Sequence, residues 1–410
     1  MRVYEYRARV SASQSANPLT NVAASQLRNR APVADCNATL QNHAVQILFV
    51  SHSHDDGVFK VGSHHLVREL ARLGFAVAHV STPYSTAHAL LSRRGRERNR
   101  LARAGVRVDA SGVKHLIPKT ILPAQFSSPA YLSRAFEAVG MRRPQLVFVD
   151  QPLMLCDAIF ELGAVTVYRP TDLYMHGSAQ RLQSKYVRRF DAVAATSTEV
   201  LARLPPADSQ PRTVIPNGVE YSRFLATDTA APRSGAVYVG AIDSRFDWAA
   251  VVSMARAFPD LEISLVGPVS SPPPDLPASV HLRGPMSYQD VPGYLALFSV
   301  GLLPLSADPS NSGRSPMKLF EYLAAGLYVV ATGVSGLTSR NDLPGCCFYS
   351  GPADAPGGLE RALANHGPNT AGMESARAQD WREKAKQLLR FAQATRLPQS
   401  DTHGVDRVAK

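Results

Sequence analysis

Apolar segments that read as buried strands alternate with segments of helical periodicity along most of this chain. This alternation constrains the fold more than any other feature, because strand–helix–strand repeats build parallel sheets covered by helices. The pattern runs on both sides of a break near residue 216, and 410 residues are enough for two cores. We therefore predict an α/β protein with two doubly wound, Rossmann-like lobes and a cleft between them.

The sequence predicts five strands in each lobe. Those of the first lobe are Val45–Ser51, Phe75–Val80, Leu146–Val149, Thr166–Arg169 and Ala192–Thr196. Those of the second lobe are Ala236–Val239, Leu261–Val266, Val280–Arg283, Val300–Pro304 and Leu327–Ala331. A helix is predicted at Ser63–Leu73, ending at Gly74, and a long terminal helix at Ala376–Ala392, which contains Trp381.

The ends of the chain differ in composition from its centre. Residues 1–43 hold several arginines among small and polar residues and lack the apolar centre of a secretory signal, so we expect a disordered basic tail. We expect the first lobe at 44–214, the second at 215–375, and a terminal helix with a frayed end at 376–410. The sequence has no uninterrupted apolar run of ~18 residues, so no membrane span is predicted.

One helix start carries a cation where the helix dipole is unfavourable to it. Ser315 and Pro316 are expected as N-cap and first helical residue, Gly326 as the residue that ends the helix, and Lys318 then lies in the first turn. A lysine at this end costs roughly 0.3–1 kcal/mol unless an anion is bound. The free N–H groups of the first turn and the Lys318 ammonium can both bind an anion, so we predict a diphosphate site at this helix start.

Glu321 follows Lys318 on the same helix face, where its two oxygens can accept both hydroxyls of a ribose. The alternative is an ordinary surface Lys–Glu pair.

A series of short motifs in the second half resembles the donor-binding half of the GT-B glycosyltransferases, two-lobed enzymes that take sugars from nucleotide diphosphates. The motifs, in the order that family shows, are Ile215–Val219 with Phe224, Val237–Gly240, Asp247–Trp248, Leu265–Pro268, Gly284–Met286, Tyr288–Tyr294, Gly301–Pro304 and the helix Ser315–Gly326. The resemblance covers roughly residues 44–392.

The first half is most similar to the xanthan glucuronosyltransferase group of bacterial exopolysaccharide enzymes. The similar segments are Ser51–Asp56, Ser63–His65 and Tyr168–Asp172, and Ser315–Lys318 resembles the S-M-K donor segment of that group. Pro285 and Leu305 depart from the group's pattern, which leaves glucuronate, glucose, galactose and mannose open as the donor sugar.

The resemblance implies a nucleotide-sugar donor, UDP-linked, in the second lobe and a polyprenyl-diphosphate-linked oligosaccharide acceptor in the first. The expected donor-binding residues are Ser315, Met317, Lys318, Glu321, Gly240 and Arg245. Arg245 is a candidate for binding phosphate, and the alternative is that it is an exposed arginine without a ligand.

Candidate bases follow two predicted strands of the first lobe, where open parallel sheets bind ligands. Asp172 follows the strand Thr166–Arg169 and can take the proton of an attacking hydroxyl, which is also the role that the resemblance implies. The alternative is that Asp172 or Thr171 caps the next helix. His52 and His54, after the first strand, are alternative bases, or part of a solvated turn with Asp55 and Asp56 closed by Gly57. Of His64 and His65, we expect one packed and one exposed.

Metal and cofactor motifs are missing from the sequence: it has no G-x-x-x-x-G-K-[ST] loop, no G-x-G-x-x-G after the first strand and no H-E-x-x-H helix. We expect no metal and no cofactor. The leaving diphosphate would then be stabilised by Lys318 and helix N–H groups, with Ser312 and Arg314 as further donors.

The formal net charge of +11 is concentrated in the run Arg93, Arg94, Arg96, Arg98, Arg100, Arg103 and Arg107. Nearby lie Lys119 and the apolar Ile117, Ile121, Leu122 and Phe126, so an anionic membrane surface is an expected partner. A solvated helix face is the alternative. Nucleic acid is not expected, because the arginines lack interleaved aromatic residues.

Four cysteines without ligand or disulfide spacing are typical of a reducing compartment. We expect a metal-independent, inverting transferase in the cytoplasm, attached peripherally to the inner face of the cytoplasmic membrane. The alternatives are a non-catalytic two-lobed binder of nucleotides or sugars and a retaining GT-B transferase. Many retaining relatives carry a glutamate eight residues before the position of Glu321, where this chain has Gly313.

Overall fold

The structure is a computed structural model that describes residues 45–55, 60–87, 99–122, 126–127, 130–225, 232–334, 337 and 343–395. Several predictions fall outside these residues: the basic tail at 1–43, the frayed end after 395, Asp56 and Gly57, and Arg93, Arg94, Arg96 and Arg98 of the basic run.

In the described part of the chain, the first sheet has eight strands in the order β10-β9-β8-β7-β1-β2-β5-β4. All neighbours are parallel except β4 and β5. The strands are β1 (Gln46–Val50), β2 (Ala76–Val80), β4 (Arg107–Val108), β5 (Lys114–Leu116), β7 (Leu146–Val149), β8 (Val165–Tyr168), β9 (Ala192–Ala195) and β10 (Arg212–Val214). A separate pair joins β3 (Tyr84–Ser85) to β6 (Lys119–Thr120).

The second sheet has six parallel strands in the order β13-β12-β11-β14-β15-β16. They are β11 (Ala236–Val239), β12 (Ile263–Val266), β13 (Val280–Gly284), β14 (Val300–Leu303), β15 (Tyr328–Thr332) and β16 (Cys346–Tyr349). The expectation of an α/β fold with two parallel sheets is therefore confirmed.

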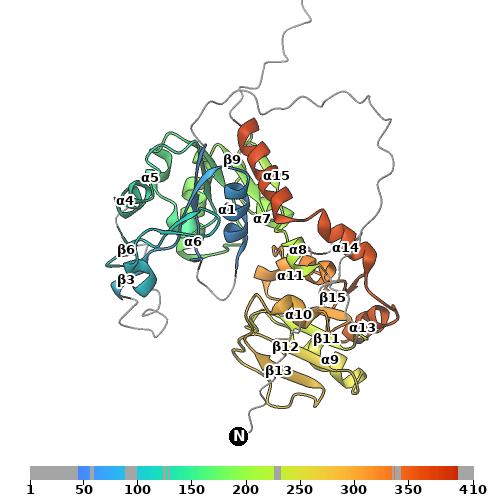
Figure 1. The fold of residues 1–410 in the computed structure, drawn as a ribbon. Coiled ribbons are helices and arrows are strands. Elements are labelled where there is room, and N and C mark those ends of the chain that lie inside the picture. Colours follow the sequence, from blue (N-terminus) through green and yellow to red (C-terminus); the bar gives the residue numbers. More distant parts are fainter. Residues whose placement is uncertain are drawn as a thin grey trace, which may run out of the picture. The chain divides into compact units, whose positions relative to one another are not determined.

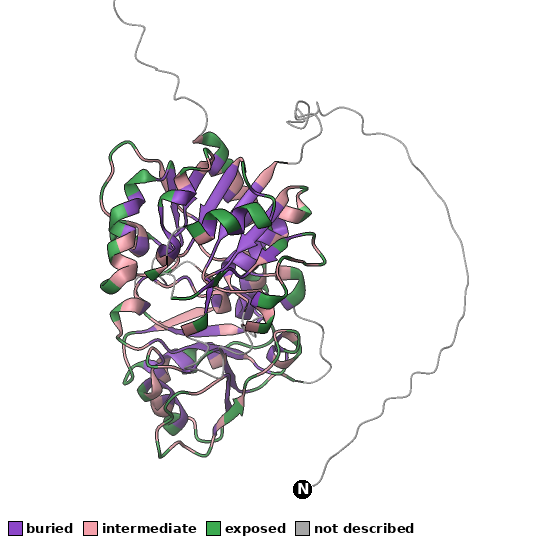
Figure 2. Cartoon of the chain, turned by 90° about the vertical axis from the view of Figure 1, so that its left-hand side faces the viewer, coloured by how far each residue is buried: buried purple, intermediate pink, exposed green. Residues whose placement is uncertain are grey.

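Helices cover both sheets. Those of the first half are α1 (Gly62–Arg72), α4 (Ala130–Ala138), α5 (Asp157–Phe160), α6 (Gly177–Tyr186), α7 (Thr198–Ala202) and α8 (Tyr221–Phe224). Those of the second half are α9 (Trp248–Ala257), α10 (Val291–Leu295), α11 (Met317–Ala324), α13 (Ala355–Leu363), α14 (Thr370–Arg377) and α15 (Trp381–Ala394). Figure 2 shows the strands buried and the outer helix faces exposed. None of the helices in the described part of the chain is both long enough and apolar enough to cross a bilayer.

The expected single helix Ala376–Ala392 is wrong, because the chain breaks between α14 and α15. Asp380 caps α15 by accepting from the N–H of Arg382 at 2.8 Å. The residues at the break pair with a distant segment: Val219 N–H donates to Gln379 O, and Trp381 N–H donates to Val219 O. Backbone groups used in these contacts cannot continue a helix.

Helix α15 packs beside α1 (Figure 1). Leu388 of α15 and Leu66 and Leu70 of α1 belong to one buried cluster with strand residues of the first sheet. The cluster fixes the start of α1 next to the carboxyl end of β1, where candidate site residues lie.

Candidate functional site

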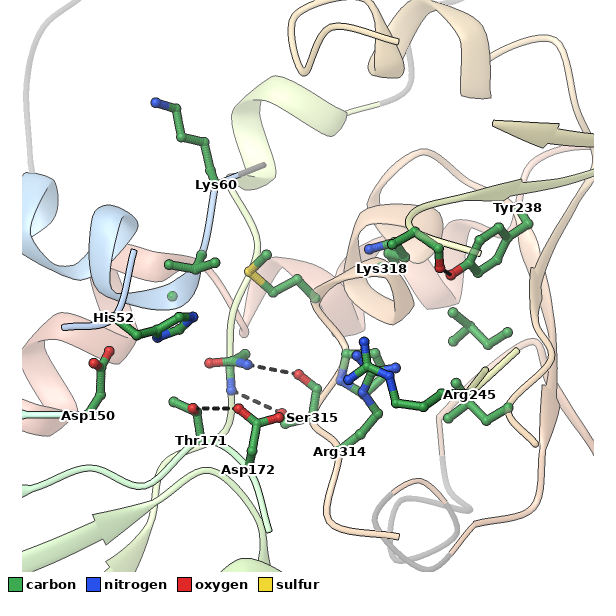
Figure 3. Close-up of a pocket in the computed structure, with 18 residues that line it drawn as sticks. His52, Lys60, Asp150, Thr171, Asp172, Tyr238, Arg245, Arg314, Ser315 and Lys318 are labelled. Carbon is green, nitrogen blue, oxygen red and sulfur yellow. Dashed lines mark hydrogen bonds between the residues drawn. The ribbon is translucent and has the colours of Figure 1, made fainter. Parts of the chain in front are cut away.

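Loops that follow strands of both sheets enclose a cavity of about 410 Å³ (Figure 3). From the first half of the chain it is lined by His52, Lys60, Val61, Gly62, Asp150, Thr171 and Asp172, together with Asn217. From the second half it is lined by Tyr238, Ala241, Arg245, Leu303, Leu305, Arg314, Ser315, Pro316, Met317 and Lys318. This is the place where open parallel sheets bind ligands.

Helix α11 opens onto this cavity, one residue later than the sequence predicts. Ser315 is not the N-cap: its hydroxyl accepts the N–H of Asn217 at 3.1 Å, and its carbonyl accepts the Asn217 amide at 2.9 Å. Pro316 takes the N-cap position with extended backbone, and no side chain of the described residues caps the helix. The N–H of Leu319 donates to Pro316 O, and the N–H groups of Met317 and Lys318 are available to a ligand.

Lys318 lies against the turn that follows β11. A Cβ added at Gly240 would lie 2.4 Å from Lys318 Cε and 2.9 Å from Tyr238 Oη, so only glycine leaves room for this lysine stem. Burial lowers the pKa of Lys318, Glu321 opposes that shift, and the charges of Arg314 and Arg245 add to it. Within the described residues, the Lys318 ammonium makes no hydrogen bond or ion pair.

Two arginines add to the positive charge around the cavity (Figure 3). Arg245 is paired with Asp243 at 2.5 Å, and this bond raises the Arg245 pKa. The Arg314 guanidinium makes no ion pair or hydrogen bond in the part of the chain that the structure describes, although its backbone N–H donates to Asn311 O. Burial lowers the pKa of Arg314, as does Arg245, whereas Asp172 raises it. The helix start and these side chains form a site suited to an anion.

Asp172 lies in the loop after β8, on the first-sheet side of the cavity. Its Oδ2 accepts the Thr171 hydroxyl at 2.9 Å. Helix α6 begins only at Gly177, with His176 as its N-cap, so the alternative that Asp172 or Thr171 caps this helix is wrong. The exposed carboxylate therefore faces the cavity without a capping role.

Asn217 connects the two sides of the site. Its Oδ1 accepts from Arg169 Nη2 at 2.8 Å, while its amide and backbone N–H bind Ser315. Arg169 is fully buried at the end of β8, and burial lowers its pKa to about 10 although Asp150 opposes the shift. The chain of contacts positions the start of α11 relative to the loop that carries Asp172.

Asp150, directly after β7, was missed by the sequence reasoning. It is 1% exposed, and its Oδ2 accepts from the Ser51 hydroxyl at 3.3 Å. Burial raises its pKa, and the charges of His52 and Arg169 oppose the increase. His52 lies beside Asp150 and lines the cavity (Figure 3), whereas His54 is not among the lining residues. The signal that could have revealed Asp150 is a carboxylate immediately after a buried strand.

Of the predicted donor-binding residues Glu321 and Met317, only Met317 is among the residues that line the cavity. Glu321 is buried behind the cavity rather than lining it, and burial raises its pKa to about 7 although Lys318 opposes the increase. Met317 lines the cavity and packs against the cluster that holds α1 and α15.

The expectation of one packed and one exposed histidine at the start of α1 is wrong, because both are buried. The His64 ring hydrogen bonds to Ser53 O at 3.1 Å. The His65 ring stacks on Trp381 with centroids 5.1 Å apart. Both histidines support the fold around α1. Among the residues that the structure describes, no three His, Cys, Asp or Glu side chains are grouped so that they could hold a metal ion.

We compared the sequence and the fold of this chain with those of known proteins. No family model matches the chain. The chain is 30% identical over 232 residues to the "Putative teichuronic acid biosynthesis glycosyltransferase TuaH" of Bacillus subtilis (strain 168). The match covers 50% of this chain and 58% of the relative, so the chain spans less than two thirds of that protein's length.

Two solved structures resemble nearly the whole described fold. Sucrose-phosphate synthase from Thermosynechococcus elongatus superposes with a TM-score of 0.64 at 17% identity, covering 85% of this chain and 98% of that one. Anabaena HepE, in complex with UDP and glucose, superposes with a TM-score of 0.62 at 13% identity, covering 85% of this chain and all of that one. At such identities the likeness concerns the fold alone. The fold of this chain is that of the GT-B glycosyltransferases.

Proposed function

We propose that this protein is a glycosyltransferase that moves a sugar from a nucleotide diphosphate to a hydroxyl of a glycan acceptor. The observation that carries the proposal is the pairing, across one cavity, of an uncapped cationic helix start with an exposed carboxylate: Lys318 on one side and Asp172 on the other. The first suits a diphosphate leaving group and the second suits a proton acceptor.

Residues 44–214 are assigned to the acceptor and residues 215–375 to the donor, with 376–410 contributing the helix that packs on α1. The solved complex of HepE contains UDP and glucose, which supports a UDP-linked donor here. The name of TuaH refers to teichuronic acid biosynthesis, which supports a polysaccharide product.

The reaction inverts the configuration at the sugar carbon. The acceptor oxygen forms a bond to C1 of the donor sugar as the bond from C1 to the diphosphate oxygen breaks, and the hydroxyl proton passes to the Asp172 carboxylate. Lys318 and the N–H groups of α11 stabilise the charge that develops on the leaving diphosphate. His52, beside Asp150, is the alternative base.

Packing at Gly313 disfavours a retaining mechanism. A Cβ at this position would lie 2.7 Å from Leu173 Cγ and 3.0 Å from Val200 Cγ2, so a glutamate does not fit here in the described arrangement. The Gly313 carbonyl also accepts the Ser197 hydroxyl at 2.8 Å.

Glucuronate is the proposed donor sugar. A UDP-linked uronate has a carboxylate in addition to its diphosphate, and the cavity offers Arg314 in addition to Lys318 and the helix start. A guanidinium binds a carboxylate through two parallel hydrogen bonds, which gives it a geometric preference for such a sugar.

The acceptor is proposed to be a polyprenyl-diphosphate-linked oligosaccharide at an anionic membrane surface. Ile121 is 78% exposed, Phe126 66% and Leu122 48%, close to the exposed Lys119. Exposed apolar side chains next to basic ones suit a bilayer surface.

Two members of the predicted membrane patch do not belong to it. Ile117 is buried, where it packs with Tyr84 and Ala102. Arg107 pairs with Asp55 at 2.5 Å, so it is not a free surface cation. The remaining described arginines of the run, Arg100 and Arg103, are exposed. They lie on the helical turn that carries Ala102.

The test is a turnover assay on the full chain with UDP-glucuronate and UDP-glucose, with a lipid-extract acceptor and release of UDP as the readout. We expect UDP release that depends on the acceptor, and an Asp172→Asn variant that still binds UDP but has lost at least about 100-fold in rate. NMR of the product anomer reports the stereochemistry. Donor binding without turnover would indicate a non-catalytic binder, and a retained rate in Asp172→Asn would transfer the base role to His52.

A further inference from the structure

A second cavity, of about 230 Å³, shares Asp172 with the larger one. Its other lining residues come from the loop after β8, from α6 and from the region of α7: Leu173, Tyr174, Met175, Gln180, Gln183, Ser184, Val200 and Arg203. The cavity therefore begins at the proposed catalytic carboxylate and extends over elements of the first sheet only.

One face of α6 supplies amide and hydroxyl groups to this cavity. Gln180, Gln183 and Ser184 are spaced three and four residues apart, so they lie on one side of the helix. The Gln180 amide donates to the Ser184 hydroxyl at 3.3 Å on the exposed edge of that face.

Gln183 is the buried member of the three, at 5% exposure. Its Oε1 accepts the Tyr168 hydroxyl at 2.8 Å, and the NH₂ group is on the other side of the amide. The structure records no protein partner for that NH₂ group among the described residues. Because Gln183 lines the cavity and this NH₂ group is not among the fully buried atoms, the group can donate to a hydrogen-bond acceptor of a ligand there.

The mixture of groups is suited to a sugar rather than to an ion or an apolar chain. Sugar hydroxyls both donate and accept, as do amides and hydroxyls, and the Leu173 and Val200 side chains offer apolar contact to C–H groups of a ring. Arg203, exposed at the end of α7, is the one cation among the described residues that line this cavity.

Asp172 links this cavity to the donor site. Its Oδ2 is occupied by the Thr171 hydroxyl, while Oδ1 makes no hydrogen bond within the described residues. A hydroxyl of a sugar in the second cavity can therefore reach a carboxylate that also faces the donor cavity.

We propose that the second cavity is the subsite for the attacked sugar of the acceptor, and that it binds a pyranoside ring with one hydroxyl at Asp172. This inference rests on the proposed function and names where its acceptor binds. It makes Gln180, Gln183 and Ser184 the residues that hold the acceptor sugar.

The experiment is saturation-transfer NMR on the full chain, recorded with and without UDP. The probes are methyl β-D-glucopyranoside, methyl α-D-mannopyranoside, methyl β-D-galactopyranoside and methyl β-D-glucuronopyranoside. The test variant is Gln180→Ala with Ser184→Ala, two exposed-edge changes on α6 that spare the buried Gln183–Tyr168 bond. The matched control is Gln393→Ala, on the exposed face of α15.

We expect at least one pyranoside to receive saturation from the wild-type chain and from the control. Loss of two hydrogen bonds predicts a Kd about tenfold or more higher in the double variant, with the UDP signals unchanged. If no pyranoside binds the wild type, or if the double variant binds as well as the control, the subsite is refuted. If UDP fails to bind while a pyranoside does, the proposed donor site fails and the sugar subsite stands.

Discussion

The contact between Gly240 and Lys318 allows the anion site to be perturbed without removing any charged group. In a Gly240→Ala variant the new methyl would lie 2.4 Å from Lys318 Cε, whereas carbon atoms pack at about 3.5–4.0 Å. The lysine stem must therefore move by about 1 Å or more. The lysine side chain is flexible and can rotate away, but Gly240 has a φ of +159°, which alanine rarely adopts, so the variant should also lose some stability.

The expected effect follows from the hydrogen bond that the displaced ammonium would lose. A hydrogen bond to a charged group contributes about 1.5–3 kcal/mol, which corresponds to a UDP Kd about tenfold to 100-fold higher. Isothermal calorimetry with UDP measures this directly. The strained backbone at position 240 should lower the melting temperature, so the affinity is measured well below the temperature at which the variant unfolds.

Gly293→Ala is the matched control, because a Cβ at Gly293 in α10 meets nothing within 4 Å. It should leave UDP affinity unchanged and raise the stability slightly, since alanine is a better helix former than glycine. If Gly240→Ala binds UDP as tightly as this control does, Lys318 is not positioned by the glycine turn to hold a diphosphate.

Two further predictions concern stability and membrane binding. Burial raises the pKa of Glu321 from 4.5 to about 7, so between these pH values the folded chain keeps a proton that the unfolded chain releases. The unfolding free energy of the wild type should therefore fall as the pH rises from about 4.5 to about 7. The fall should exceed that of Glu321→Gln by up to about 3 kcal/mol. Urea denaturation at several pH values measures this difference, and a difference that is constant with pH would contradict the buried protonated carboxyl. Replacing Ile121, Leu122 and Phe126 by serine should reduce sedimentation with phosphatidylglycerol vesicles at least about tenfold, because apolar area would no longer enter the interface. Leu297→Ser, at another exposed leucine, should sediment like the wild type, and equal sedimentation of both variants would exclude the patch.

Strands were the most predictable part of the fold. The bounds of β7 and β11 agree with the prediction residue for residue, because each is a continuous apolar run with a clear end. The short strands β4, β5 and β10 carry charged or polar residues and were not predicted. Their place in the sheet is determined by neighbouring strands rather than by local pattern.

The start of α11 shows why local signals fail near a site. Serine followed by proline is a typical helix opening, yet the Ser315 hydroxyl accepts a hydrogen bond from Asn217, 98 residues away in sequence. The same holds for the break before Trp381, where Val219 takes up the backbone groups. Neither contact could be inferred from the residues next to it.

The candidate site was predictable in kind but not in geometry. Lys318 and Asp172 could be singled out by their places after a helix start and a strand, and both line the cavity. The sequence does not indicate that Glu321 lies behind the cavity, because burial depends on tertiary packing. Asp150 could have been found from its place directly after a predicted strand.

The central claim is that the first turn of α11, with Lys318, holds the diphosphate of a nucleotide sugar. Calorimetry of UDP binding to Lys318→Ala, beside a Lys119→Ala surface control, tests it most directly. We predict a Kd about 100-fold higher than that of the wild type in Lys318→Ala, an unchanged Kd in the control, and melting temperatures within a few degrees of each other. Equal UDP affinity in the two variants would contradict the claim.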